Sequence, residues 1–288
     1  MKRLYFSNSL FTNVLYMLLY AFACLGCKKD AEPSRKLAVE HVSLLSKRTQ
    51  KDAENLRQGL PKGAALLRPF FEKAGIEPLD YQTADRALRD ARGYVEDLRK
   101  AKSDFFLIAQ SDGRITRNNL EQDDMAGENL FRAYPPLKRV LKNDAAEALG
   151  TWAIAKGVKG RADAQWITAV PIKGQSQTLG VYASGWSWSR YAERLESQLR
   201  DQVLKETAPG QNVPLIYAYI LVEGAAYGAP IAPMVNIETF LKTEPSKRIE
   251  QGKLSEVHEI LGTPFGIALQ EVPSFEKKVA IVVFRSEI

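Results

Sequence analysis

Cysteine and histidine are scarce in this sequence of 288 residues. Both cysteines, Cys24 and Cys27, lie close to the N-terminus, so the rest of the chain has no disulfide and no thiol. The two histidines are His41 and His258, whereas a zinc site usually needs more nitrogen or thiolate ligands. We therefore expect no metal and no other cofactor, and we expect His41 to be a solvated helix residue and His258 to be structural.

Enzyme signatures are missing as well. The sequence has no glycine-rich phosphate loop and no His-Glu-x-x-His motif, and Gly185-Trp-Ser-Trp-Ser lacks the second glycine of a Gly-x-Ser-x-Gly elbow. The net charge is +6, but acidic and basic residues are interspersed, with no arginine-rich arm and no basic stripe. This pattern predicts neither catalysis nor nucleic-acid binding. An uncharacterised enzyme remains one alternative.

The N-terminus carries the clearest signal in the sequence. Lys2 and Arg3 precede an apolar run, Leu10–Leu25, which Thr12 and Asn13 interrupt. A membrane-spanning helix needs about 20 predominantly apolar residues, so this run is too short and too broken to span. A positive start followed by a short apolar run is typical of a secretion signal.

The end of this run resembles a bacterial lipobox. It reads Ala23-Cys24-Leu25-Gly26-Cys27, and the resemblance implies cleavage after Gly26 and lipidation of Cys27. One position departs from the pattern, because Cys24 stands where leucine is usual. Lipidation at Cys24, which has the less suitable Phe22 before it, and an uncleaved membrane anchor are the alternatives. The resemblance implies multiple acyl chains, which are enough for firm attachment.

The predicted location follows from this anchor. The folded part should lie in the cell envelope, outside the cytoplasm and facing the periplasm of a diderm host. Lys28 follows the lipidated cysteine in place of the aspartate that commonly retains lipoproteins in the inner membrane. We therefore favour the outer membrane.

Hydrophobic periodicity and turn residues divide the chain into segments. The first helix carries apolar residues three and four apart from Val42 to Leu60 and is expected to break at Pro61-Lys62-Gly63; further helices are expected at 64–74 and 83–100. The predicted segments are a signal peptide (1–26), a tether and start of a helix (27–50), a helical segment (51–102), an α+β unit (103–207), a connector (208–212) and a second, smaller α+β unit (213–288).

The unit at 103–207 has strand patterns on both sides of a helical stretch. A buried strand (104–110), the Asp112-Gly113 turn and a second strand (114–117) precede helical pieces at 123–141. Strands are expected at 150–156, 164–172 and 178–187, before a helix at 189–206. Two strands, helices and three more strands predict a five-stranded antiparallel sheet.

This order resembles the PAS-like fold of Cache domains, which are extracytoplasmic sensor modules of bacteria. The resemblance covers residues 83–207 and rests on Asp104–Thr116, Met125–Phe131, Gln165–Ile172 and Leu179–Tyr182. It implies an α+β fold with N-terminal helices, followed by one or two such sheets with flanking helices. It also implies that a small ligand binds between sheet and helices.

The segment at 213–288 looks like a second copy of this unit. Strands at 215–222 and 225–228 surround Glu223-Gly224, and helices at 236–242 and 246–251 precede strands at 257–261, 264–272 and 277–285. The alternatives are an unrelated small α+β domain and extra strands on the first sheet.

All four tryptophans lie close together in the first unit, between Trp152 and Trp188. Aromatic walls with a few polar groups suit a ligand pocket. The predicted ligand-binding residues are Arg117, Arg132, Trp152, Trp166, Thr168 and Tyr182, with Tyr134 as a further polar anchor. The alternative is that the tryptophans fill the core and the two arginines are solvated.

These observations predict a membrane-anchored, non-enzymatic lipoprotein that senses or binds a small molecule. Since the sequence shows no spanning or cytoplasmic output segment, the protein should act through a protein partner. A competing hypothesis is an envelope structural or assembly protein that uses the same fold without a ligand.

Overall fold

The computed structural model describes residues 31–75, 79–142, 144–152, 163–275 and 278–287. The predicted signal peptide and the lipidation site at Cys27 lie outside these residues. So do positions 153–156 of the strand expected at 150–156. Among the described residues, no helix is long and apolar enough to cross a membrane.

The described part of the chain begins at residue 31, and its first helix is α2, one continuous helix of 43 residues, Glu32–Ala74. The predicted break at Pro61 is wrong, because Pro61 and Pro69 both lie inside the helix. A proline costs a helix interior about 3 kcal/mol. Burial of one large aliphatic side chain returns about 1.5–3 kcal/mol, and Leu56, Leu60 and Leu67 are all fully buried. Tertiary packing therefore outweighs the local penalty.

The helix expected at 83–100 is divided into α3 (Tyr81–Tyr94) and α4 (Glu96–Lys100). The chain is extended at Val95, with φ −97° and ψ 111°. This change of direction places Leu98 against α2, where a Cβ on Gly59 would lie 2.6 Å from a methyl group of Leu98. The buried residues of α3 recur at helical spacing on one face, and they are Ala84, Ala87, Leu88 and Ala91.

The first sheet is antiparallel, with the strand order β2-β1-β5-β4-β3. Its elements in chain order are β1 (Phe105–Gln110), β2 (Ile115–Asn118), α5 (Leu130–Ala133), the 3-10 helix η1 (Pro135–Leu141), β3 (Ala146–Gly150), β4 (Gln165–Lys173), β5 (Thr178–Ser187) and α6 (Trp188–Glu206). The strand expected to begin at Gly150 ends there. Ala146 and Ala148 alternate with Glu147 and pair with β4, and these small residues gave little hydrophobic signal.

The second sheet has the equivalent order, β7-β6-β10-β9-β8. Its elements are β6 (Leu215–Val222), β7 (Ala225–Gly228), α7 (Met234–Leu241), the 3-10 helix η2 (Pro245–Lys247), β8 (Lys253–Ile260), β9 (Thr263–Glu271) and β10 (Val279–Ser286). The helix expected at 246–251 is wrong. Positive φ angles at Glu244 and Gln251 turn the chain before and after η2, so a longer helix does not form. The α+β class and two five-stranded sheets are confirmed.

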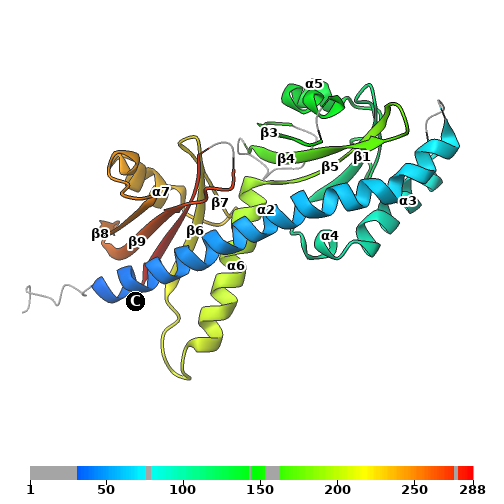
Figure 1. Ribbon diagram of the computed structural model, residues 1–288. Coiled ribbons are helices and arrows are strands. Elements are labelled where there is room, and N and C mark those ends of the chain that lie inside the picture. Colours follow the sequence, from blue (N-terminus) through cyan, green and yellow to red (C-terminus); the bar gives the residue numbers. More distant parts are fainter. Residues whose placement is uncertain (1–30, 76–78, 143, 153–162, 276–277, 288) are drawn as a thin grey trace, which may run out of the picture.

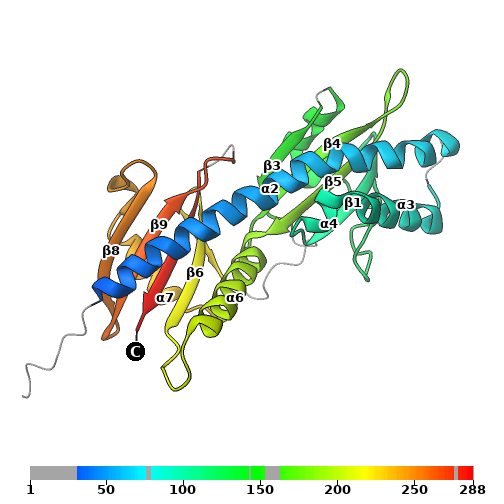
Figure 2. The same cartoon turned by 60° about the horizontal axis from the view of Figure 1, so that its bottom comes forward.

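Helix α2 runs along both sheets and joins their cores (Figures 1 and 2). One hydrophobic cluster contains Leu56 of α2, Trp186 of β5, Leu199 of α6 and Val283 of β10. The backbone of β9 meets α2 directly, since a Cβ on Gly266 would lie 2.1 Å from the backbone nitrogen of Arg35. The outer face of each sheet has its own smaller cluster, covered by α5 and η1 in the first unit and by α7 in the second.

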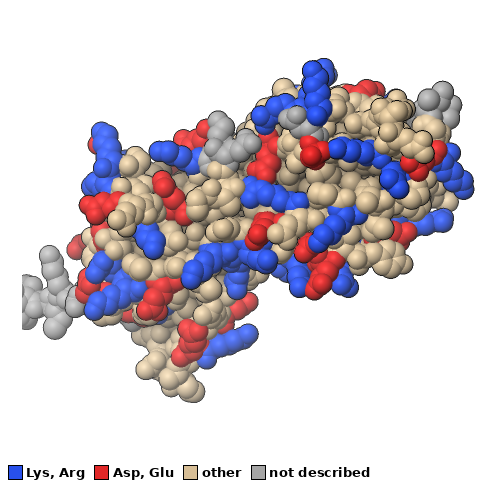
Figure 3. All heavy atoms as spheres, viewed as in Figure 1, with Lys and Arg blue, Asp and Glu red and all other residues tan. Residues whose placement is uncertain are grey.

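Charges of both signs are mixed on the face shown in Figure 3. On this face, lysine and arginine side chains alternate with aspartate and glutamate side chains over α2 and both sheets. The interspersed pattern of the sequence is therefore retained on this surface.

Candidate functional site

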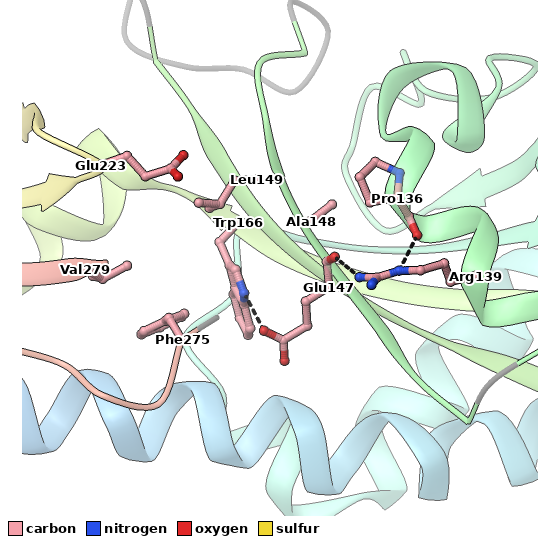
Figure 4. Close-up of a pocket in the computed structure, with 9 residues that line it drawn as sticks. All are labelled: Pro136, Arg139, Glu147, Ala148, Leu149, Trp166, Glu223, Phe275 and Val279. Atoms are coloured by element: carbon pink, nitrogen blue, oxygen red, sulfur yellow. Dashed lines mark hydrogen bonds between the residues drawn. The ribbon is translucent and has the colours of Figure 1, made fainter. Parts of the chain in front are cut away.

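A cleft of about 480 Å³ lies between the two sheets, beside α2 (Figure 4). The first unit contributes residues from η1, β3 and β4, and the second contributes the β6–β7 turn, the segment before β10 and the first residue of β10. The lining residues are Pro136, Arg139, Glu147, Ala148, Leu149, Trp166, Glu223, Phe275 and Val279. We call this space the inter-sheet cleft. Its volume is within the range of small-molecule pockets.

Two aromatic rings form one wall of the inter-sheet cleft. The ring of Trp166 packs against Phe275, edge to face, with centroids 5.3 Å apart. Behind it, Trp186 lies 4.4 Å from Trp166, and Trp188 lies 5.5 Å from Phe275. Because Trp166 and Phe275 come from different units, the wall depends on the two sheets being held together.

Glu147 is the acidic group in the floor of the cleft. Its carboxylate accepts hydrogen bonds from Arg57 Nε at 2.5 Å and from Arg57 Nη2 at 2.9 Å. It also accepts one from Trp166 Nε1 at 3.0 Å. The Arg57 guanidinium lies 5.5 Å from the ring centroids of both Trp166 and Phe275. Glu147 is therefore neutralised by Arg57 and orients the indole of Trp166.

Two further charged side chains lie at the rim, on opposite sides of the cleft (Figure 4). Arg139 belongs to η1, and its Nε donates to the carbonyl oxygen of Pro136 at 3.2 Å. Glu223 belongs to the tight turn between β6 and β7, where its φ is +49° and its backbone N–H donates to Lys278 O at 3.0 Å. The cleft therefore combines an aromatic wall and the already paired Glu147 with a positive group on one side and a negative group on the other.

Of the predicted ligand residues, only Trp166 lines the inter-sheet cleft. Thr168 and Tyr182 lie on the α2 side of the first sheet, with exposures of 2% and 0%. Tyr182 packs on Gly63 of α2, and burial raises the pKa of its hydroxyl. Among the described residues, that hydroxyl has no hydrogen-bond partner.

Trp152 lies on the outer face of the first sheet, half-buried against Tyr134. Their ring centroids are 5.9 Å apart, edge to face. The side-chain oxygen of Gln165 accepts hydrogen bonds from Tyr134 Oη at 3.0 Å and from Trp152 N at 2.8 Å. Burial raises the pKa of Tyr134. This group is separate from the inter-sheet cleft.

The two predicted arginines differ in their surroundings. Arg132 is exposed on α5, as the solvated alternative predicts. Arg117 is only 5% exposed, so a solvated role for it is wrong. Its guanidinium lies 2.9 Å from Asp123 and 3.3 Å from Asp85, and it stacks on the ring of Tyr81 at 4.4 Å. A buried charge needs such partners, and here they tie α3 to β2.

Sequence reasoning missed most of the cleft. Glu147 was overlooked because β3 was expected to begin four residues too late. Arg57 is not one of the apolar residues that define the buried face of the helix, so the periodic pattern does not select it. Phe275 lies between strands, where a single aromatic residue gives no periodic signal. Only the clustering of tryptophans indicated this region.

Solved structures with the same arrangement come from bacterial chemoreceptors. The periplasmic sensory domain of a Campylobacter jejuni chemoreceptor superposes with a TM-score of 0.53 at 13% identity, covering 89% of this chain and 95% of that one. The ligand-binding domain of a Pseudomonas aeruginosa amino acid chemoreceptor, in complex with GABA, gives 0.50 at 14% identity, covering 85% and 96%. The ligand-binding domain of a Pseudomonas fluorescens chemoreceptor, in complex with L-isoleucine, gives 0.50 at 11% identity, covering 89% and 93%.

This chain has a double Cache-like fold. The identities are low, so the similarity establishes the architecture alone. No protein-family model matches the sequence, and no curated protein matches it either. In this double Cache-like fold, the inter-sheet cleft lies where the two units meet.

Proposed function

We propose that this protein is an extracytoplasmic sensor that binds a small molecule in the inter-sheet cleft. The observation that carries the proposal is the combination of an aromatic wall with charges of opposite sign at the two sides. Trp166 and Phe275 would contact the apolar part of a ligand, and Arg139 would pair with a carboxylate. Glu223, on the opposite side, would accept a hydrogen bond from an amino group.

This arrangement favours molecules whose carboxylate and amino group are at opposite ends. An ω-amino acid such as GABA has this distribution of charge, whereas a dicarboxylate would bring one charge close to Glu223. Support comes from the similar fold of chemoreceptor domains whose structures contain GABA or L-isoleucine. Of the residues predicted from the sequence, we retain Trp166 in this site.

We further propose that the protein is anchored by lipid at Cys27 and has no catalytic activity. A ligand in the cleft contacts both units and would change how they sit on α2. This change would be read by a protein partner in the envelope.

A thermal-shift screen of amino acids, organic acids, sugars and nucleobases tests the ligand proposal. A ligand at 100 times its dissociation constant adds about 2.7 kcal/mol of stability. We therefore expect hits with separated charges to raise the melting temperature by at least about 2–4 °C and to change tryptophan fluorescence.

Matched arginine variants locate the site. Arg139→Gln should weaken any carboxylate-bearing hit by roughly tenfold or more, whereas Arg132→Gln should leave it unchanged. The reverse result would move the site to the residues predicted from the sequence. A screen without hits would contradict the proposal and favour the alternative, an envelope scaffold that binds no ligand.

A further inference from the structure

A second hollow of about 320 Å³ lies within the second unit. It is on the face of the second sheet that points away from α2, beneath α7 and η2. Leu221, Leu269 and Ala280 line it from the strands, and Leu241, Pro245 and Ile249 line it from the opposite side. All but Pro245 also belong to the outer cluster of this sheet or pack against it. The hollow is therefore a gap in an otherwise apolar layer.

An acidic and a basic side chain lie together at this hollow. Glu271 pairs with Ala280 across β9 and β10, and Lys278 is two residues before Ala280. Side chains two apart along a strand share a face, and diagonal neighbours across a pair are within reach of long side chains. Both Glu271 and Lys278 line the hollow.

Neither of these two charged side chains is in an ion pair with another described residue. Within the described part of the chain, neither side chain has an ion-pair partner within 4 Å, and they do not pair with each other. The other carboxylate at the hollow, Glu244, already pairs with Lys247 at 2.7 Å. An apolar space thus ends at a negative group, the half-exposed Glu271, and a positive group, the exposed Lys278, on the same sheet face.

We infer that this hollow is a second ligand site, for an α-amino acid with an aliphatic side chain. In such a molecule the ammonium and carboxylate are adjacent, as Glu271 and Lys278 are. The ammonium would donate to Glu271, the carboxylate would accept from Lys278, and the aliphatic chain would replace the empty space between the leucines. The inter-sheet cleft differs, because the two charges at its rim, Arg139 and Glu223, lie on opposite sides. The second site does not depend on the proposed function of the cleft.

The probe for this site is L-norleucine, with hexylamine and hexanoate as its two half-charged counterparts. Isothermal titration of the purified protein should show saturable binding of L-norleucine. Each counterpart lacks one charged contact and should bind at least roughly tenfold more weakly.

Glu271→Gln and Lys278→Gln should each weaken L-norleucine binding by roughly tenfold. Glu259→Gln is the matched control, because Glu259 is an exposed carboxylate on β8 outside the hollow. It should bind L-norleucine as the parent protein does. Trp166→Phe should also leave this binding unchanged, even where it weakens a ligand of the cleft.

Three results would overturn the inference. They are the absence of saturable L-norleucine binding, an equal loss in Glu271→Gln and Glu259→Gln, and loss of binding in Trp166→Phe with retention in Glu271→Gln. The last result would place the amino acid in the inter-sheet cleft. Unchanged circular dichroism and melting temperature of each variant would show that a loss is local.

Discussion

The carboxylate of Glu147 on β3 accepts two hydrogen bonds from the guanidinium of Arg57 on α2. The two residues are 90 positions apart in the sequence. Their side chains are 15% and 29% exposed, respectively. This bidentate pair joins the long helix to the edge of the first sheet, directly beneath the inter-sheet cleft.

Removing Arg57 should therefore cost more than removing a surface arginine. Arg57→Met leaves Glu147 half-buried with Trp166 as its remaining donor, and we expect a loss of about 1–3 kcal/mol in unfolding free energy. Arg68→Met is the control, since Arg68 is exposed and 3.7 Å from Glu72 one turn away. It should change stability by less than about 0.5 kcal/mol. Urea unfolding followed by tryptophan fluorescence measures both, and equal losses would contradict the interpretation.

The close approach of β9 to α2 predicts a strong effect of one methyl group. A Cβ on Gly266 would lie 2.1 Å from Arg35 N, so Gly266→Ala must push the helix away from the sheet. We expect a loss of at least about 1–3 kcal/mol. Gly93→Ala in α3 meets no atom within 4 Å and should be neutral or stabilising. The melting temperatures of the two variants test this prediction, and similar values would contradict it.

His41 is only 7% exposed, so the solvated role expected from the sequence is wrong. This buried histidine should make the protein less stable in mild acid. Burial and the Arg285 guanidinium lower the pKa of His41 to about 4, against the opposing carboxylates of Glu206 and Glu287. The unfolded chain, with an ordinary histidine pKa near 6.5, binds a proton first. Stability is thus lost as the pH falls from about 6.5 towards 4.

His41→Gln cannot bind this proton and should lack this part of the pH dependence. Relative to the parent protein, it should gain about 1–2 kcal/mol between pH 7.5 and pH 5. Carboxylates titrate in both proteins, so their contributions to the unfolding free energy cancel in this difference. His258→Gln, on β8, keeps His41, so its stability should fall with pH as that of the parent protein does. If the difference in stability between His41→Gln and the parent protein does not change with pH, His41 does not titrate as its surroundings predict.

The connector at 208–212 is exposed, and we propose that it separates the two units. Limited proteolysis should cut there first. Since one hydrophobic cluster spans both sheets, the two fragments should remain associated in size-exclusion chromatography and separate only in denaturant. Primary cleavage within β4 or β5, with the connector intact, would contradict this boundary.

Lipidation is tested by the cysteines themselves. Cys27→Ser should abolish labelling by a fatty-acid analogue and leave the protein unprocessed or soluble, while Cys24→Ser should retain labelling. Labelling that persists in Cys27→Ser and disappears in Cys24→Ser would assign the anchor to Cys24.

Sequence patterns predicted those elements whose signals are local. The bounds of β5, β6 and β7 agree with the structure, because apolar runs there end at turn residues such as Glu223-Gly224. Pro61 misled the prediction because its local cost is balanced by packing against both sheets. Whether the helix continues through Pro61 depends on residues that are far away in the chain.

The sites were harder to predict, for the same reason. Arg117 looked like a surface charge until Asp85, 32 residues earlier, was placed beside it. The cleft brings together β3, β4 and the segment before β10, and α2 lies beneath it. No pattern within one segment relates Arg57 to Glu147 or Trp166 to Phe275.

The course of α2 also sets the order in which the protein can be completed. Its first turns are covered by β9 and β10, and the backbone N–H of Glu287 donates to Ser34 Oγ at 3.3 Å. Helix α2 is therefore buried by strands that are synthesised long after it. Contacts this distant in sequence form slowly. Until β9 and β10 have been made, the nascent chain must carry the apolar stripe of α2 uncovered, and this is the interval in which it most needs protection from aggregation.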